Sequence, residues 1–423
     1  MSKLEEGAKT LYPYRCVILI IASAIHAALQ FAILIVPGVA PALIGQYGIP
    51  ATAFSLIATM PYLTGFLFGV ASGAAADKTS IRLVLIAGLA VAFVGAALRA
   101  FSTAFAPLLV SSFFLGFALA ALNANSAKIM RLWFPGKSTS VAMGIYIAAA
   151  TVGAALGLGV GPVLPSVEIA FQIPAVLMGL AFAVWVLFGR KHPDGESAEQ
   201  SAKEPIVEHL KVIAKSKNVW LISLCLFALF GCTVSVQTFA NIAFTSLSGS
   251  MTTAGIIAAI NTIAIGAGGI IMPIIVSRMK RLKPIFICCG ILNAVVLFSI
   301  LHIGYGPLTF VILGFEGLLY GVLIPMGKTL PALIPDVKLS HVGVTGGMQS
   351  MMQNLGAFLI PSFVVTPVCT ALAGGNEVLL PLYVFSGAAI CSIACAVFMF
   401  FVPETGTSAE ARLKKEAAQV AKV

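Results

Sequence analysis

The sequence predicts an all-α polytopic membrane protein, with twelve transmembrane helices in two pseudo-symmetric six-helix bundles. Three observations support this fold class. Of the 423 residues, 59% are hydrophobic and only 9% are charged; long apolar runs recur along the chain; and the second half of the sequence resembles the first. A soluble domain carries about 25% charged residues, and a water-exposed surface cannot be built from so few charges.

Twelve apolar runs, separated by charged residues, glycine and proline, are each long enough to cross the hydrocarbon core, which takes about 20 mostly apolar residues. The first run continues well beyond the about 7–15 residues of a signal-peptide core, so we expect it to be retained as a span. One fewer span remains an alternative if a proline-rich segment only dips into the membrane. The predicted spans are 16–45, 51–75, 82–103, 106–127, 138–163, 167–189, 218–247, 251–276, 284–304, 307–329, 342–367 and 380–402.

The basic residues predict the orientation of the chain. Twelve spans place both termini on one side. With the termini, residues 190–217 and alternate loops inside, every Lys and Arg except Arg99 becomes cytoplasmic. Because cytoplasmic loops carry an excess of Lys and Arg, we expect a multi-pass protein of the cell membrane with both termini cytoplasmic. Lys128, Arg131 and Lys137 then mark the cytoplasmic end of the fourth span.

An internal repeat divides the chain into two halves. Sliding the sequence by 200 residues brings Pro107 onto Pro307 and Lys128 onto Lys328, and a three-residue insertion then brings Gly153 onto Gly356. Such repeats are typical of secondary transporters. The predicted organisation is a first bundle at 1–189, a cytoplasmic linker with a short amphipathic helix at 190–217, a second bundle at 218–402 and a cytoplasmic tail at 403–423.

Other classes of protein find little support in the sequence. The eight cysteines lie mostly in apolar runs, form no CxxC pair and share no metal-ligand spacing with histidine, so we expect no metal site. No ATP-binding glycine-rich loop and no nucleophile–base pair stands out, so we expect neither a cofactor nor enzymatic activity. The net charge of +10 belongs to the cytoplasmic loops, which argues against nucleic acid as a partner.

The loop between the second and third spans carries the most specific motif. It reads GAAADKTSIR at 73–82 and resembles the G-x-x-x-D-[RK]-x-[GS]-x-[RK] signature of the major facilitator superfamily, bacterial type. The resemblance implies that fold and a cytoplasmic gate formed by Gly73, Asp77, Lys78 and Arg82. A glycine lets helices approach closely, and a carboxylate can meet a helix N-terminus or pair with an arginine. The alternative is a charged turn without a gating role.

The segment AKIMRLWFPGKS, residues 127–138, follows the fourth span. A basic residue, then WFP, then a basic loop is similar to the nitrate and cyanate/nitroimidazole porter branches of the superfamily. The nitrate branch places an arginine in the middle of the second and eighth spans. These spans contain no cation here, which argues against nitrate itself. We expect Trp133 in the interfacial aromatic belt.

The fifth span carries a stripe of small residues. Gly153, Gly157 and Gly161 are each four residues apart and are followed by Pro162, so one face lets a neighbouring helix come close. The stripe is similar to the glycine–proline motif of drug:proton antiporters, although the proline lies four residues late. The alternative is ordinary close packing between two moving halves.

Two ionisable side chains are predicted near the middle of the membrane. At 1.5 Å per residue, Glu316 lies roughly 13 Å into the tenth span and His26 about 16 Å from Arg15 on the first. Such residues usually face the bundle interior or a water-filled cavity, and a carboxylate there is costly unless it is protonated or partnered. We expect Glu316, with His26, to couple protons or recognise charge. The alternatives are structural roles for both.

Polar side chains at helical spacing complete the expected binding site. In the superfamily that the chain resembles, spans 1, 4, 7 and 10 line a central cavity and spans 2, 5, 8 and 11 form its sides. The alternative is that these polar groups only join helices. The expected substrate-binding residues are His26, Gln30, Asn123, Gln237, Asn241, Glu316, Tyr320, Gln349 and Gln353.

Together these features predict a monomeric transporter that works by alternating access. Its substrate would be a small polar organic solute, such as an organic acid or similar metabolite, bound between the halves and moved by proton coupling or exchange. A proton-coupled multidrug efflux pump is the alternative within the class. A membrane sensor or scaffold that binds a ligand without moving it is the alternative outside the class.

Overall fold

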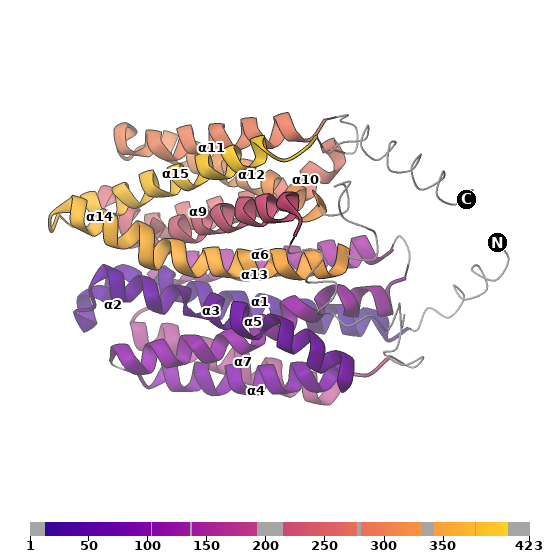
Figure 1. Cartoon of the computed structure of the whole chain (residues 1–423). Helices are drawn as coiled ribbons and strands as arrows, with labels where there is room; N and C mark the ends of the chain where they lie inside the picture. Colours follow the sequence, from indigo (N-terminus) through magenta and orange to yellow (C-terminus); the bar gives the residue numbers. More distant parts are fainter. Residues whose placement is uncertain are drawn as a thin grey trace. The chain divides into compact units, whose positions relative to one another are not determined.

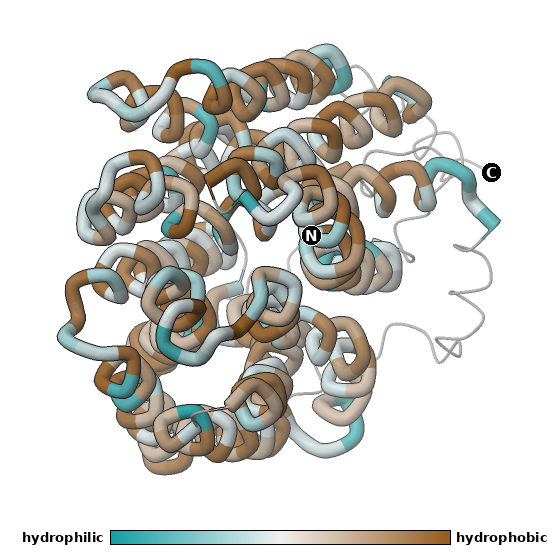
Figure 2. Tube along the Cα trace, turned by 90° about the vertical axis from the view of Figure 1, so that its left-hand side faces the viewer, coloured by the Kyte–Doolittle hydropathy of each residue, from teal (hydrophilic) through white to brown (hydrophobic). Residues whose placement is uncertain are grey.

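The computed structural model describes residues 13–102, 104–135, 138–192, 215–276, 281–330, 342–376 and 378–404. Within them, twelve helices are long and apolar enough to cross a membrane. They are drawn as coiled ribbons in Figure 1, and hydrophobic colouring is spread over the helices in Figure 2. The predicted amphipathic linker helix and the cytoplasmic tail beyond residue 404 lie outside the described residues.

The chain divides into two compact units, residues 1–201 and residues 202–423. The helices of the first unit are α1 (Arg15–Gly38), α2 (Ala40–Tyr47), α3 (Ala51–Lys78), α4 (Ile81–Ala100), α5 (Phe105–Trp133), α6 (Ser138–Val160), the 3-10 turn η2 (Gly161–Val163) and α7 (Val167–Phe188). Those of the second are α9 (Lys217–Ser248), α10 (Met251–Val276), α11 (Lys283–Ile303), α12 (Pro307–Thr329), α13 (Val342–Leu359), the π-helical turn η5 (Ile360–Val365), α14 (Thr366–Ala373) and α15 (Leu379–Phe400).

Several helix ends differ from the predicted spans: the eleventh span continues through η5 and α14 to Ala373, α4 ends at Ala100, and proline accounts for two further differences. The first predicted run, 16–45, is broken after Gly38, and α2 is a separate short helix. Pro41 cannot donate to the carbonyl group four residues earlier and its ring clashes with that group. The fourth run continues to Trp133 and ends at Phe134, which precedes Pro135 and takes φ −132° and ψ 71°, outside the helical region as expected before proline. Helix α3 also extends beyond its predicted end, through Lys78.

The same packing pattern recurs in both units. In the first, α1 packs against α6 and α7, α5 against α3 and α4, and α4 against α7. In the second, α9 packs against α13 and α15, α12 against α10 and α11, and α11 against α15. Each pair of the first unit thus has its counterpart in the second, so the repeat seen in the sequence is a repeat of helix packing.

Equivalent glycines mark the closest helix contacts of the two units. A side chain at Gly153 of α6 would overlap the backbone of Ala27 on α1, and one at Gly356 of α13 would overlap the backbone of Phe227 on α9. The sequence alignment that brings Gly153 onto Gly356 therefore corresponds to the same helix contact in both units. Small residues in these positions bring the helix backbones together.

Large apolar side chains remain exposed along the middle of the helices. Val152, Val176, Ile263 and Val295 are each more than half exposed, although a soluble monomer rarely exposes apolar patches of such extent. Lipid tails are the natural solvent for these surfaces. The polar side chains considered below are instead mostly turned into the units.

Candidate functional site

Glu316 lies in the interior of the second unit, where it is 2% exposed. The amide nitrogen of Asn261, on α10, donates hydrogen bonds to the Glu316 carboxylate and to the carbonyl oxygen of Leu313, the latter at 2.8 Å. Asn261 is itself buried. One amide group thus links α10 to α12 and stabilises the carboxyl group.

A second asparagine approaches Glu316 from α11. Asn293 faces the carboxyl group, and its amide nitrogen donates to the hydroxyl oxygen of Ser392 on α15 at 3.2 Å. The same nitrogen lies 4.0 Å from the sulfur atom of Cys232 on α9. The Ser392 hydroxyl group donates in turn to the carbonyl oxygen of Gly290 at 2.9 Å. The carboxyl group is therefore part of a polar cluster to which five helices contribute.

Tyr320 lies one helical turn after Glu316, as the sequence predicts, and is 1% exposed. Thr233 of α9 approaches its hydroxyl group, and the ring of Phe230 packs edge-on with the centroids 6.3 Å apart. This Glu316 cluster, made of Glu316, Tyr320, Asn261, Asn293, Cys232, Thr233 and Ser392, is buried and contains no basic side chain. An ionised carboxylate in such surroundings needs donated hydrogen bonds to offset its lost hydration, and here the donors are neutral amides.

His26 forms a separate polar cluster in the first unit. The amide nitrogen of Gln30 lies 3.4 Å from its Nε2 atom, so the predicted pair on α1 is in contact. The His26 ring stacks on Tyr146 of α6, with the centroids 4.3 Å apart, and Ser126 of α5 approaches the Tyr146 hydroxyl group. Sequence reasoning missed Tyr146. The available signal was that it lies two helical turns before Gly153, on the face of α6 that packs against α1.

The predicted amides of α13 are buried and one turn apart. Gln349 is 2% exposed and Gln353 is 5% exposed, and neither amide nitrogen has a hydrogen-bond partner within the described part of the chain. A buried donor without an acceptor costs about 1–3 kcal/mol, which a bound acceptor would recover. On the other predicted helices, Asn241 is buried, Gln237 is half-buried and Asn123 is exposed.

The fold also buries Arg99, which the sequence analysis singled out only as the basic residue that is not cytoplasmic. It lies at the end of α4 and is 1% exposed. Its guanidinium group donates to the carbonyl oxygen of Ala32 at 2.7 Å and to the hydroxyl groups of Ser111 and Ser112 at 3.2 and 2.8 Å, and it lies 5.8 Å from the centre of the Phe171 ring. These contacts tie α4 to α1, α5 and α7, so Arg99 is a structural residue of the first unit.

In the predicted gating motif, Asp77 forms an ion pair with Lys128, at the end of α5. Both residues had been singled out in the sequence, but their pairing had not. Arg82 donates to the carbonyl oxygen of Val186 on α7 at 2.8 Å. A Cβ atom at Gly73 would lie 3.8 Å from the side chain of Ala124, so within the described residues of this unit Gly73 does not mark a close helix contact. Its role in the gate stays a prediction.

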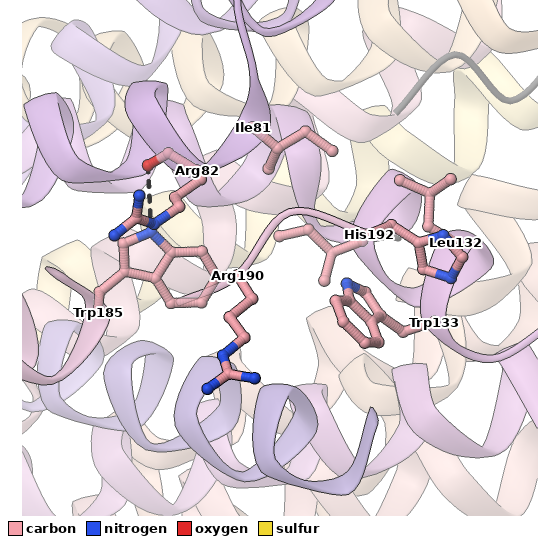
Figure 3. A pocket seen from close by; sticks show the side chains of 8 residues that line it. Ile81, Arg82, Leu132, Trp133, Trp185, Arg190 and His192 are labelled. Carbon is pink, nitrogen blue, oxygen red and sulfur yellow. Dashed lines mark hydrogen bonds between the residues drawn. The ribbon is translucent and has the colours of Figure 1, made fainter. Parts of the chain in front are cut away.

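One further expectation needs correction. The glycine stripe of α6 does not mark packing between the two halves, since Gly153, Gly157 and Gly161 all face α1 of the same unit. Trp133, which the sequence predicts in the interfacial belt, is 6% exposed and packs against Tyr14 and His192, with ring centroids 6.3 and 5.0 Å apart. Figure 3 shows Trp133 beside His192.

Comparison with protein families gives one match that covers most of the chain. The model of the Major Facilitator Superfamily matches residues 19–361. Among curated proteins, solute carrier family 49 member A3 of Danio rerio is 22% identical over 293 residues, which cover 65% of this chain. The matching region spans 61% of that relative's own length.

Solved structures show the same fold. A bacterial homologue of the human lysosomal transporter Spinster, in an inward-facing unoccupied conformation, superposes with a TM-score of 0.72 at 16% identity, covering 92% of this chain and 96% of the other. The nucleoside transporter NupG superposes with a TM-score of 0.72 at 17% identity, covering 91% and 100%. The E. coli fucose:proton symporter FucP gives 0.62 at 16% identity, covering 92% and 100%.

Proposed function

Because the chain belongs to the major facilitator superfamily, whose members are transporters, we propose that it is a secondary active transporter for a small polar organic solute. The observation that carries this proposal is the pair of buried amide nitrogens of Gln349 and Gln353, which lack acceptors within the described residues. Spaced one turn apart on α13, they suit a ligand with two hydrogen-bond acceptors, such as a carboxylate or a carbonyl-bearing ring.

Coupling to protons is the second part of the proposal, and it rests on Glu316. Its carboxyl group is buried among neutral donors. Gaining or losing a proton there changes the charge of the Glu316 cluster with no basic side chain to compensate. Because a change of charge in a dry interior alters which packing is favoured, protonation can bias the conformational equilibrium on which alternating access depends.

A multidrug efflux pump has less support. Two sequence features suggested it, the glycine stripe of α6 and the membrane carboxylate Glu316. The stripe packs against α1, and ordinary helix contact explains it, whereas Glu316 is compatible with either function. Proton-dependent resistance to unrelated lipophilic cations would favour the efflux pump instead. A sensor or scaffold would bind the solute but would not move it across a membrane.

A thermal-shift screen of the purified protein against small acids, amines and nucleobases tests the proposal, since a ligand stabilises the folded state according to its concentration relative to its dissociation constant. Gln353→Met should raise the dissociation constant of any ligand found in the screen by about tenfold, as expected for one lost hydrogen bond. The matched control is Met352→Gln on the neighbouring position, which leaves both amides in place. Uptake of the hit into proteoliposomes then separates a transporter from a sensor.

A hit that stabilises Gln353→Met and the unmodified protein equally would contradict the assigned binding residues. Saturable binding without any uptake or exchange in proteoliposomes would contradict the transport activity itself.

A further inference from the structure

Asn293 is the second amide beside Glu316, and its oxygen atom has no partner. The side chain is fully buried, and its Oδ1 atom makes no hydrogen bond within the described residues. Such buried acceptors are rare in folded proteins, because an acceptor that loses contact with water needs a donor in exchange. The oxygen atom of Asn293 is therefore available for a donor that the Glu316 cluster lacks in its present state.

The other amide, that of Asn261, is held in one orientation by its neighbours. Its nitrogen atom donates to the carbonyl oxygen of Leu313 at 2.8 Å as well as to the Glu316 carboxyl group. A carbonyl oxygen only accepts hydrogen bonds, so an amide turned over at this position would place two acceptor oxygens against each other. Asn261 thus presents a donor to Glu316 whether the carboxyl group is ionised or protonated.

The partners of the Asn293 amide allow either orientation. Its nitrogen atom donates to the hydroxyl oxygen of Ser392 at 3.2 Å and lies 4.0 Å from the sulfur atom of Cys232. A hydroxyl group donates as readily as it accepts, and a thiol group does both weakly. Half a turn about the Cβ–Cγ bond exchanges the nitrogen and oxygen of an amide with little change of shape. Asn293, which faces Glu316 from α11, can therefore present either a donor or an acceptor.

The two protonation states of Glu316 need different partners. An ionised carboxylate only accepts hydrogen bonds, whereas a protonated one has an O–H group that has to donate. Among the described residues, the other titratable groups that face Glu316 are the Cys232 thiol of α9 and the Tyr320 phenol; α10 and α11 contribute the uncharged asparagines. The hydroxyl groups of Tyr320 and Thr233 approach each other and can share a hydrogen bond. The Asn293 oxygen is thus the acceptor that best suits a proton on Glu316.

We propose that Asn293 is a positioning residue for the proton on Glu316 and that its amide turns over when the proton binds. This role rests on the proton coupling proposed for Glu316. When Glu316 is ionised, the amide nitrogen of Asn293 faces the carboxylate; when Glu316 is protonated, its O–H group donates to Asn293 Oδ1. The turn also reverses the direction of the hydrogen bond with Ser392, so a proton on α12 alters a contact between α11 and α15.

Infrared difference spectroscopy of the full-length protein in phosphatidylcholine vesicles, recorded between acidic and alkaline buffer, tests this role without a substrate. A protonated carboxyl group has a carbonyl stretching band, and each hydrogen bond that the group forms lowers the frequency of the band. The Glu316 band is the one that is lost on Glu316→Gln. We expect it at higher frequency in Asn293→Leu, since leucine keeps the branching at Cγ but has neither a donor nor an acceptor.

Asn293→Asp is the second variant and covers the case in which leucine prevents folding. It keeps the shape and an acceptor oxygen, and a carboxyl oxygen accepts the proton more strongly than an amide oxygen does. The Glu316 band should therefore move to lower frequency. The matched control is Ser299→Ala, which removes from the same helix a hydroxyl group that donates to the carbonyl oxygen of Val296; the Glu316 band should stay in place.

The outcomes separate the role of Asn293 from the proposed coupling. A Glu316 band at the unmodified frequency in either folded variant of Asn293 would overturn the role of Asn293 and leave proton coupling intact. If no band depends on Glu316 in the unmodified chain, Glu316 takes up no proton, and both the coupling and the role of Asn293 are overturned.

Discussion

At the scale of single residues, the structure gives Glu316 neighbours that the sequence did not suggest. The predicted partners, a proton, a cationic part of the substrate or His26, stay predictions. Within its own unit, the carboxyl group is surrounded by the amides of Asn261 and Asn293. Neutral donors form hydrogen bonds with the carboxyl group without holding it in the ionised form. The carboxyl group can therefore gain and lose a proton, whereas a permanent ion pair would keep it ionised.

Glu316→Gln tests that role, since glutamine keeps the shape and an acceptor for Asn261 but cannot ionise. If Glu316 couples protons, the variant should lose gradient-driven accumulation in proteoliposomes and retain substrate exchange. If it binds a cationic part of the substrate, affinity should fall by about tenfold or more, because a hydrogen bond to a charged group contributes about 1.5–3 kcal/mol. Asn261→Asp, which removes the donor and places a second carboxyl group beside the first, is the companion variant.

Unchanged accumulation together with unchanged affinity in Glu316→Gln would leave Glu316 with a structural role only. In that case Asn261→Asp should lower thermal stability without a specific effect on the coupling of transport to the proton gradient.

Asp77 provides the second test at this scale. Its ion pair with Lys128 is largely exposed, with 60% of the Asp77 side chain accessible, and exposed pairs contribute only about 0–1 kcal/mol to folding. Asp77→Asn should therefore leave thermal stability nearly unchanged while it strongly slows transport, with substrate binding kept, if the motif controls gating. Lys128→Gln removes the other half of the pair and should have the same effect. Transport by Asp77→Asn at the unmodified rate would refute the gating role.

At the scale of helices, glycine positions decide which backbones can touch. The contact of α6 with α1 at Gly153 recurs in the contact of α13 with α9 at Gly356. Gly116 on α5 and Gly317 on α12 repeat the pattern, since a Cβ atom at the first would press on Thr64 of α3 and one at the second on the Asn261 backbone of α10. Close backbone approach is thus a property of the repeat itself and was retained in both units.

Gly153→Ala should destabilise the protein by about 1–3 kcal/mol, because an added methyl group overlaps backbone atoms that cannot move aside as a side chain can. Gly144→Ala on the same helix is the matched control: nothing lies within 4 Å of its Cβ position, and alanine favours the helix by up to about 1 kcal/mol. Thermal unfolding in detergent checks both. The helix contact would be of no consequence if the two variants unfolded at the same temperature.

At the scale of the whole molecule, the orientation in the membrane is a prediction from the distribution of basic residues. In a background without the natural cysteines, a cysteine at position 305, in the exposed loop before α12, should react with an impermeant reagent added outside intact cells. A cysteine at position 199, in the linker, should not. Asn376, between the eleventh and twelfth spans, is a second position expected outside. Its side chain accepts hydrogen bonds from the backbone nitrogens of Val378 and Leu379, so Tyr305 is preferable as the labelling site. Labelling of position 199 from outside would show that the predicted orientation is wrong.

The sequence by itself determined the number of spans, their approximate limits and the internal repeat. Each of these can be read from the sequence: about 20 apolar residues span the hydrocarbon core wherever they occur, proline interrupts a helix at some positions, such as Pro41 and Pro135, and a repeat survives as aligned glycines and prolines. The family resemblance likewise rested on contiguous motifs, chiefly GAAADKTSIR, together with the span count and the repeat. The helix pairs His26–Gln30 and Glu316–Tyr320 also follow from local spacing.

Only the tertiary structure decided which residues meet. Asn261 lies 55 residues from Glu316 in the chain, Lys128 lies 51 from Asp77, and Arg99 reaches Ala32 across 67. Membrane helices are apolar around most of their circumference, so their hydrophobic pattern does not indicate which face turns inward. The rotation of each helix is set by packing of small residues and by polar contacts between helices, and these become visible only when the neighbouring helices are in place.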